Sequence, residues 1–196
     1  MTDIILSDNE FIISDVKVKH NTPSFYTESI NGKGNALSRG LHSMEIEAKI
    51  TCINDLDIKK FEALMLRIRG RLNPFKLSLQ DSTDGKGYCN PLFTDVKPMT
   101  ATAVSIGQTK LTLSGFSGEI PAGSKFQFPN DSKVYVLLTP ALPNREVEIF
   151  PAVRFAQVIK TRMNFSPEPL VRLNGDVFDI QYANGAEYSL KMKEVM

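Results

Sequence analysis

The segment spanning residues 109–151 constrains the fold more than any other part of the chain, because apolar and polar residues alternate along it. Successive side chains of a β-strand point to opposite faces, so this period of two predicts strands with one apolar and one wet face. The alternating apolar residues are Leu111, Leu113, Phe126, Phe128, Val147 and Ile149. With the run Ser132-Lys133-Val134-Tyr135-Val136, and with no helical period between them, these stretches predict a small closed or sandwiched β-module.

The most regular strand pattern lies nearer the N-terminus, in residues 44–52. Its alternate positions carry the apolar residues Met44, Ile46, Ala48, Ile50 and Cys52. We therefore expect a strand with one face in the core and the other in water. Shorter stretches of the same kind indicate an early strand around Val16 and Val18 and a later one around Phe75, Leu77 and Leu79.

Between these strands the apolar period becomes helical. From Asp55 to about Arg69, apolar residues recur at helical spacing. They are Phe61, Leu64, Met65, Ile68 and later Leu72. Asn54 or Asp55 can cap the start of this helix, and Gly70 with the Asn73-Pro74 pair can end it. One amphipathic helix is therefore expected in a chain that is otherwise built of strands.

Two segments with strong turn chemistry remain. Residues 21–40 are rich in Ser, Asn, Gly and Thr, which predicts a long, mobile loop. The Asn184-Gly185 pair is a strong hairpin signal, and it lies between the alternating residues 178–182 and 188–192. Because an isolated two-stranded ribbon is only marginally stable, we expect this hairpin to pair with the strand at residues 44–52.

The predicted fold class is mainly β with one helix, divided between two modules. Residues 1–90 form a sheet-plus-helix module, which the C-terminal hairpin in residues 165–196 completes. Residues 91–164 form a β-module inserted between these two parts. A loop at residues 81–87 and a connector beginning at Asn90-Pro91 would lead into the inserted module.

Composition excludes several classes of partner. The 196 residues include 23 basic and 22 acidic side chains, so no global field attracts nucleic acid or an anionic membrane. No window approaches the ~18 apolar residues of a spanning helix, so no membrane insertion is expected. Cys52 and Cys89 are expected to be unpaired, and residues 1–6 show no secretory signal. These features favour a reducing, aqueous compartment, or export inside something larger.

His20 and His42 are the only histidines in the chain. His42 precedes Ser43 and Glu45, which invites a catalytic-triad interpretation. Adjacent strand residues point apart, however, and Ser43 lacks a glycine-flanked elbow, so we favour a structural or solvated histidine. The histidines and cysteines also match no clustered spacing of metal ligands.

Two polar segments could bind anions. The run Asn31-Gly32-Lys33-Gly34-Asn35 lacks the glycine spacing and the Lys-Ser/Thr pair of a phosphate loop, so a flexible surface loop is favoured. The best candidates for contact with a polyanion are Lys59, Lys60, Arg67, Arg69 and Arg71. Lys60, Arg67 and Arg71 are expected to share one helical face. A solvated face with a favourable helix-dipole contact is the favoured interpretation.

Phe126, Phe128 and Tyr135 could stack on bases or sugars if the β-module were an oligonucleotide/oligosaccharide-binding (OB) barrel. Phe126 and Phe128 share one strand face, however, which favours a place in the core. The carboxylates Asp176 and Asp179 have no accompanying acid–base partner. We therefore predict no enzyme, and no catalytic, cofactor-binding or metal residue.

The order of these elements resembles the distal tail (Dit) proteins of long-tailed bacteriophages, of the type with an OB-like second domain. The resemblance covers nearly the whole chain, and its motifs are Ser38-Arg39-Gly40-Leu41-His42, Gly70-Arg71-Leu72-Asn73-Pro74-Phe75, Gly118-Glu119-Ile120-Pro121-Ala122-Gly123-Ser124-Lys125-Phe126, Asp131-Ser132-Lys133-Val134-Tyr135 and Glu148-Ile149-Phe150-Pro151. A terminal strand carrying Leu190 and Glu194 follows. The chain departs from the family at Ser124, where aspartate is frequent, and at Met44, where an aromatic residue is frequent.

This resemblance implies a virion protein of the tail tip, assembled in the host cytoplasm. Six copies would form a ring that joins the tail tube protein to the baseplate hub or to the tail-tip and fibre proteins. Residues 1–90 and 165–196 would be the ring-forming domain, and residues 91–164 an OB-like barrel outside the ring. Head-to-tail contacts would repeat until the ring closes, with exposed strand edges as natural contact sites.

Two other functions stay open from the sequence. The OB-like domain could be a binding module for cell-wall oligosaccharide or single-stranded nucleic acid, although specific nucleic-acid binding is not favoured. The chain could also be an unrecognised hydrolase, for which His42 would be the best candidate residue.

Overall fold

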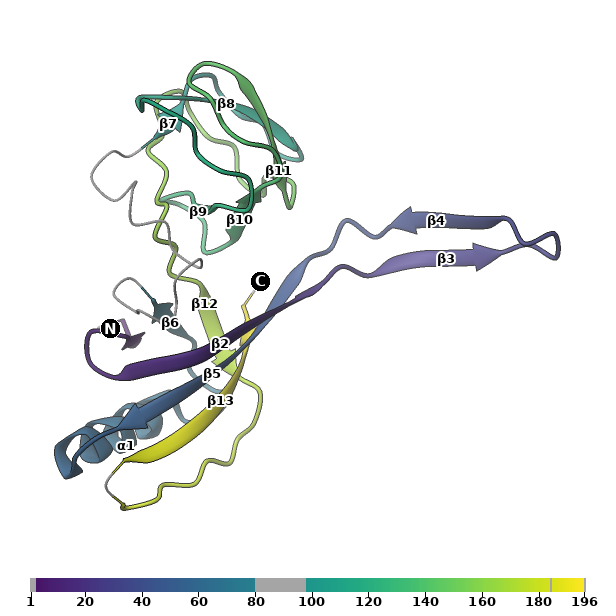
Figure 1. Cartoon of the computed structure of the whole chain (residues 1–196). Helices are drawn as coiled ribbons and strands as arrows, with labels where there is room; N and C mark the ends of the chain where they lie inside the picture. The colour runs from purple at the N-terminus through teal and green to yellow at the C-terminus, as the bar shows by residue number, and fades with distance from the viewer. Residues whose placement is uncertain (1–2, 80–97, 184, 196) are drawn as a thin grey trace.

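The computed structural model describes residues 3–79, 98–183 and 185–195. In these residues the chain is mainly β with one helix, which confirms the predicted fold class. Figure 1 shows a large sheet with the helix, a separate curled sheet, and a long two-stranded ribbon that projects away from both. The predicted loop at residues 81–87, the connector at Asn90-Pro91 and Cys89 lie outside the described residues.

The large sheet has six strands in the order β1-β6-β12-β13-β5-β2. Their bounds are β1 Ile5–Ser7, β2 Ile12–Asn21, β5 Ser43–Cys52, β6 Phe75–Ser78, β12 Leu170–Leu173 and β13 Ala186–Glu194. The pair β1–β6 is parallel and the other pairs are antiparallel. Strands from both ends of the chain therefore share one sheet, and β13 pairs with β5 as the sequence predicted.

Strand β5 is central to the packing of this sheet. Its residues Met44, Ile46, Ala48, Ile50 and Cys52 are all buried, at 2% exposure or less. Cys52 carries a free thiol within this core. The alternate residues Glu47 and Lys49 are exposed, which confirms the predicted alternation. The outward face that β5 shares with β13 carries exposed ion pairs, such as Lys191 with Glu47.

The helix α1 Asp55–Ile68 covers the apolar face of the sheet (Figure 1). Asn54 caps its start, and the Asn54 side chain accepts a hydrogen bond from the Asp57 N–H at 3.0 Å. Arg69 ends it in a left-handed conformation, with φ at 54°. The predicted apolar residues Phe61, Leu64, Met65 and Ile68 are buried in the core, whereas Leu72 lies beyond the helix and is 61% exposed.

The second sheet curls on itself and has the strand order β7-β8-β11-β10-β9. Its strands are β7 Met99–Thr100, β8 Lys110–Ser114, β9 Lys125–Gln127, β10 Val134–Leu137 and β11 Glu146–Phe150. Met99 at one edge bridges to Arg162, and Gln127 at the other edge bridges to Asn164. The segment around residues 162–164 thus lies between the two edge strands and closes the curl. We call this unit, residues 98–164, the barrel.

Two local predictions are wrong. Residues 21–40 are not a loop throughout, because β2 runs to Asn21 and the ribbon of β3 Ser24–Glu28 and β4 Gly34–Ser38 follows. Residues 178–182 form no strand, so the C-terminal hairpin around Asn184-Gly185 does not exist as predicted. Instead, β12 is the antiparallel neighbour of β13, and Phe178 and Ile180 pack from an irregular segment against the core.

Candidate assembly arm and domain junction

The β3–β4 ribbon, with the turn that joins its strands, is the feature that most needs explanation. We call residues 22–41 the arm. Phe25 pairs with Leu37, and Tyr26 pairs with Ala36. The turn is fixed by the Gly32 N–H, which donates to the Ser29 carbonyl, and by the Ser29 N–H, which donates to the Lys33 carbonyl. The arm is therefore a regular hairpin with a defined turn.

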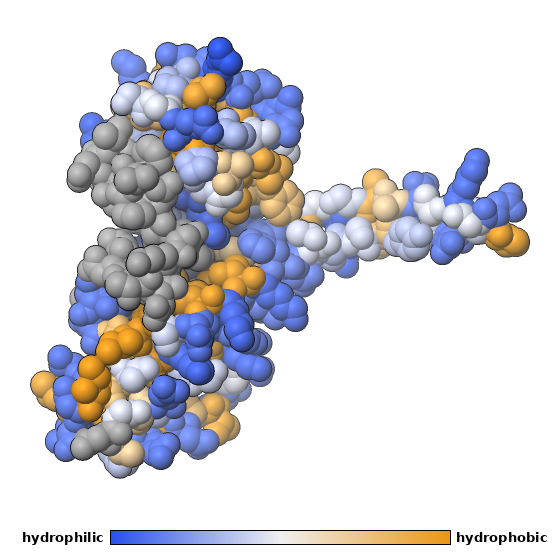
Figure 2. Space-filling model, viewed as in Figure 1, coloured by the Kyte–Doolittle hydropathy of each residue, from blue (hydrophilic) through white to orange (hydrophobic). Residues whose placement is uncertain are grey.

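All five residues of each arm strand are exposed. Phe25 is 59% exposed, Leu37 is 69% exposed and Ile30 at the turn is completely exposed. The space-filling view shows apolar side chains along the arm and at its tip (Figure 2). A two-stranded ribbon without a core is at best marginally stable in water. Apolar side chains gathered on such a projection are typical of a surface that another molecule covers.

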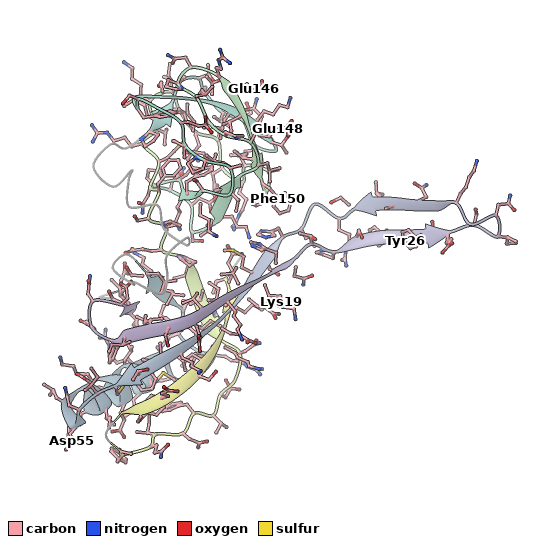
Figure 3. The ribbon with its side chains drawn as sticks, viewed as in Figure 1. Lys19, Tyr26, Asp55, Glu146, Glu148 and Phe150 are labelled. Carbon is pink, nitrogen blue, oxygen red and sulfur yellow. The ribbon has the colours of Figure 1, made fainter. Side chains whose placement is uncertain are left out.

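Short-range contacts organise the arm side chains without burying them. The guanidinium of Arg39 lies over the Phe25 ring, 5.3 Å from its centroid. Tyr26, midway along the arm in Figure 3, lies across Gly34. A Cβ atom at Gly34 would stand 2.5 Å from the Tyr26 hydroxyl oxygen, so glycine there leaves room for the ring. The aromatic side chains are thus held in place on the ribbon by contacts within the arm itself.

The root of the arm is formed by the two histidines. His20 is opposite Met44 near the end of β2, and His42 immediately precedes β5. Their rings stack with centroids 5.2 Å apart, and His20 Nδ1 lies 2.9 Å from His42 Nε2. The edge of the stack meets Phe150 of the barrel, whose ring centroid is 4.9 Å from that of His42. Figure 3 places Phe150 on the side of the barrel that faces the arm root.

Both histidines are shifted towards the neutral form. Burial lowers the pKa of His42 to about 4, and the neighbouring positive charges of Lys133 and protonated His20 act in the same direction. Burial also lowers the pKa of His20, and Lys125 and Lys133 contribute to this shift while Glu194 opposes it. At neutral pH the pair is therefore uncharged, and one ring nitrogen donates to the other.

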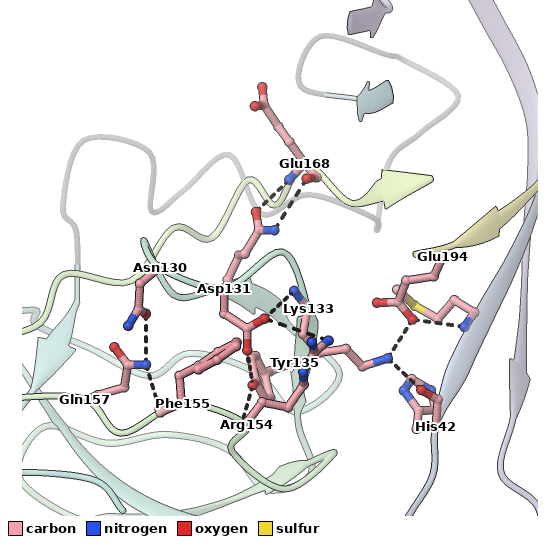
Figure 4. A network of polar contacts seen from close by, with 12 residues as sticks. His42, Asn130, Asp131, Lys133, Tyr135, Arg154, Phe155, Gln157, Glu168 and Glu194 are labelled. Atoms are coloured by element: carbon pink, nitrogen blue, oxygen red, sulfur yellow. Dashed lines mark hydrogen bonds and ion pairs between the residues drawn. The ribbon is translucent and has the colours of Figure 1, made fainter. Parts of the chain in front are cut away.

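A buried ion pair joins the barrel to the sheet beside these rings (Figure 4). Lys133, which immediately precedes β10, places its Nζ 2.5 Å from Glu194 Oε2 on β13. The Lys133 side chain is 2% exposed and that of Glu194 is completely buried. Lys133 Nζ also donates to the His42 carbonyl at 2.8 Å, and Glu194 Oε2 accepts from the Met44 N–H at 3.1 Å. The contact therefore connects β10, β13 and the start of β5.

The same segment is anchored inside the barrel by Asp131. This carboxylate accepts a hydrogen bond from the Tyr135 hydroxyl at 2.6 Å and another from the Lys133 N–H at 2.9 Å (Figure 4). Burial, followed by the hydrogen bond to Asp131, raises the pKa of Tyr135, so the phenol stays protonated. The Tyr135 oxygen in turn accepts from the Arg154 N–H at 3.1 Å. Lys133 is thus held at its backbone by the barrel and at its side chain by Glu194.

The residues considered for catalysis are not brought together around a reaction site. The His42 ring contacts His20 and Phe150, and these are not the partners that the triad interpretation with Ser43 and Glu45 would require. Asp176 and Asp179 lie on the exposed segment after β12, where Asp176 contacts Arg71. Among the described residues, no group of three or more His, Cys, Asp or Glu side chains could hold a metal ion.

The described anion-binding candidates lie on separate parts of the structure, and as a set they do not line a common cleft. The run Asn31-Gly32-Lys33-Gly34-Asn35 forms the turn and the first residues of β4 at the arm tip. Arg71 lies beyond the end of α1, so it does not share a helical face with Lys60 and Arg67 as predicted. Its guanidinium donates to the Asn174 carbonyl and holds the segment after β12.

The aromatic residues of the barrel form its core, as the strand pattern favoured. Phe126 and Tyr135 are completely buried and Phe128 is 1% exposed. Their rings pack with centroids 5.3 to 5.5 Å apart. These three residues therefore cannot stack on an incoming base or sugar without unfolding the barrel. In the part of the chain that the structure describes, no helix has both the length and the apolar character needed to cross a membrane.

Sequence reasoning missed the arm and the Lys133–Glu194 contact. The Asn31-Gly32 pair, flanked by Phe25 and Leu37, is the one signal that could have indicated a hairpin there. No local pattern identifies the ion pair, because its two residues are 61 positions apart. Comparison of the chain with models of known protein families and with curated protein sequences gave no match.

Proposed function

We propose that this chain is a structural subunit of a phage tail tip that assembles into a hexameric ring and joins the tail tube to the baseplate or tail-tip complex. The observation that carries the proposal is the arm, which projects from the sheet with its aromatic and aliphatic side chains in solvent. A second copy of the chain would supply the cover that the arm lacks. The resemblance to distal tail proteins supports the number of copies and the neighbours in the particle.

The arm is suited to a head-to-tail contact. It lies on one side of the molecule, so its receiving surface belongs to a different part of the next copy. Repetition of such a contact closes a ring when the rotation from copy to copy adds up to a full turn. The edge strand β2 is less suited, because its register shifts between Ser14 and Lys17 and Asp15 adopts a positive φ of 49°. Bulges and charges of this kind discourage pairing between edge strands.

The buried junction supports the same role. A ring subunit must hold its domains in one relative orientation, because errors in angle accumulate from copy to copy. Lys133 and Glu194, which lie in two of the motifs that carry the resemblance, connect the barrel to the sheet. The alternative of a binding module loses its candidate stacking platform, since Phe126, Phe128 and Tyr135 are core residues, as the sequence favoured.

Electron microscopy of the full chain mixed with its tail-tube and tail-tip partners tests the proposal. We expect six-fold rings with the native chain and none with the double variant Phe25→Ser, Leu37→Ser. The matched control is Ile106→Ser, Val158→Ser, which removes two exposed apolar side chains from the barrel and should leave the rings intact. Monomers alone under all conditions, or rings that the arm variant forms equally well, would contradict the proposal.

A further inference from the structure

The arm root and the barrel are coupled through one small cluster of titratable groups. His20 belongs to β2 and His42 leads into β5, so both lie where the arm strands leave the sheet. On the barrel side the cluster meets Phe150, Lys125 of β9 and Lys133 before β10. Glu194 of β13 completes it. A change of charge in this cluster therefore affects both the arm root and the barrel.

We propose that the His20–His42 pair is an acid-sensitive latch, which holds the barrel against the arm root while it is neutral and releases the barrel when it is protonated. The 2.9 Å contact between His20 Nδ1 and His42 Nε2 requires one nitrogen to donate and the other to accept. Protonation of both rings makes both nitrogens donors, so the hydrogen bond is lost and two like charges face each other. The two facing nitrogens can share one proton, but they cannot each carry a proton in this geometry.

The surroundings of the pair oppose protonation. His42 Nδ1 is buried without a hydrogen-bond partner among the described residues, so a proton placed there is unsatisfied. Lys133 and Lys125 add positive charge beside the rings. The facing carboxylate Glu194 already binds Lys133 and the Met44 N–H through Oε2, while its Oε1 is buried without a hydrogen-bond partner among the described residues. Asp131 and Arg154 flank Lys133 on its barrel side. Protonation therefore favours any state in which the rings leave this cluster for water.

The size of the expected shift follows from the protonation equilibria of the docked and released states. A histidine in water has a pKa of about 6.5, whereas burial lowers the pKa of docked His42 to about 4. Acidification from neutral pH to about pH 4 should therefore raise the ratio of released to docked molecules by about 100-fold through this ring alone. The latch is a property of a single chain, and under the proposed function it regulates the orientation of the barrel relative to the arm.

Distance measurements between spin labels on the isolated chain test the latch. Labels at Glu119→Cys on the barrel and Lys60→Cys on α1, in a Cys89→Ser background, report the orientation of the barrel; Cys52 is buried and reacts poorly. We expect one narrow distance at neutral pH and a second, growing population between pH 6.5 and 4, while circular dichroism shows the chain still folded. The variant His20→Gln, His42→Gln keeps amide hydrogen-bonding groups but cannot titrate, so its distances should not change with pH.

A single unchanged distance in the folded native chain down to pH 3.5 would overturn the latch, and so would the same transition in the glutamine variant. The variant Glu194→Gln distinguishes titration of this carboxylate from titration of the histidines. A transition that persists in the histidine variant but is lost in Glu194→Gln would belong to Glu194. Nuclear magnetic resonance of the native chain covers the case of a variant that does not fold. A His42 ring that titrates near 6.5 while the barrel stays docked would also overturn it. Ring assembly is measured separately at neutral pH, so either proposal can fail without the other.

Discussion

The arm and the barrel both extend from the same six-stranded sheet, yet they are stabilised in opposite ways. The barrel closes around its own aromatic core, where Phe126 is completely buried. The arm has the same strand geometry but no core, and Phe25 remains 59% exposed. The barrel is further joined to the sheet by the buried Lys133–Glu194 pair. One element therefore carries its stability within the chain, whereas the other has no core of its own and, under the proposed function, depends on a partner.

Replacing the same residue type in the two regions should give the largest contrast. Phe126→Ala removes a buried ring and should lower the free energy of unfolding by about 4 kcal/mol. Phe25→Ala removes an exposed ring and should change it by less than about 0.5 kcal/mol. Urea denaturation of the isolated chain measures both values. Similar losses for the two variants would show that the arm packs within its own chain and would remove the basis of the comparison.

Breaking the buried ion pair at the junction should cause the second-largest loss of stability. Lys133→Met leaves Glu194 buried without its cation, and we expect a loss of about 3 kcal/mol, the low end for a broken buried pair because Glu194 keeps the Met44 N–H. The matched control is Lys110→Met, which removes a lysine paired with Glu146 and Glu148 on the barrel surface and should cost less than about 1 kcal/mol. Equal costs for the two lysines would mean that the junction does not hold the barrel.

The smallest effect is the dependence of stability on pH at the arm root. The folded chain lowers the pKa of His42 below its unfolded value of about 6.5. Its contribution is therefore complete above pH 6.5, declines as the pH falls towards about 4, and stays constant below that. The full shift corresponds to about 3 kcal/mol, and we expect a decline on the order of 2 kcal/mol because folded molecules that release the barrel also protonate this ring. Denaturation of the native chain and of His42→Gln across this range measures the difference; parallel curves would contradict the assignment.

How much of this structure the sequence predicts depends on whether one face of an element is buried. Strand β5, helix α1 and the barrel strands each bury one face, so their apolar period identified them. The arm exposes both faces, so no period forms, and its Ser, Asn and Gly residues look like a loop. The prediction for residues 178–182 is wrong for the opposite reason. Phe178 and Ile180 alternate and pack against the core, but their segment joins no ladder of backbone hydrogen bonds.

The candidate site was less predictable than the fold for a related reason. The Lys133–Glu194 pair and the His20–His42 pair bring together residues that are far apart in the sequence. The Lys133–Glu194 pairing depends on the way the barrel sits against the sheet, and the His20–His42 pairing depends on the register of β2 with β5. Local patterns encode neither. The motifs of the resemblance to distal tail proteins include the segments of Lys133 and Glu194, but the resemblance implies no contact between these two residues.

Hydrogen exchange of the arm amides, before and after assembly with the tail partners, tests the central claim most directly. In the isolated chain, residues 24–38 should exchange much faster than the barrel strands β8 and β11, because the ribbon opens without unfolding a core. In the assembled particle the same amides should be protected by the neighbouring copy. Arm amides that are already as protected as the barrel in the isolated chain, or that stay unprotected in the particle, would contradict the account.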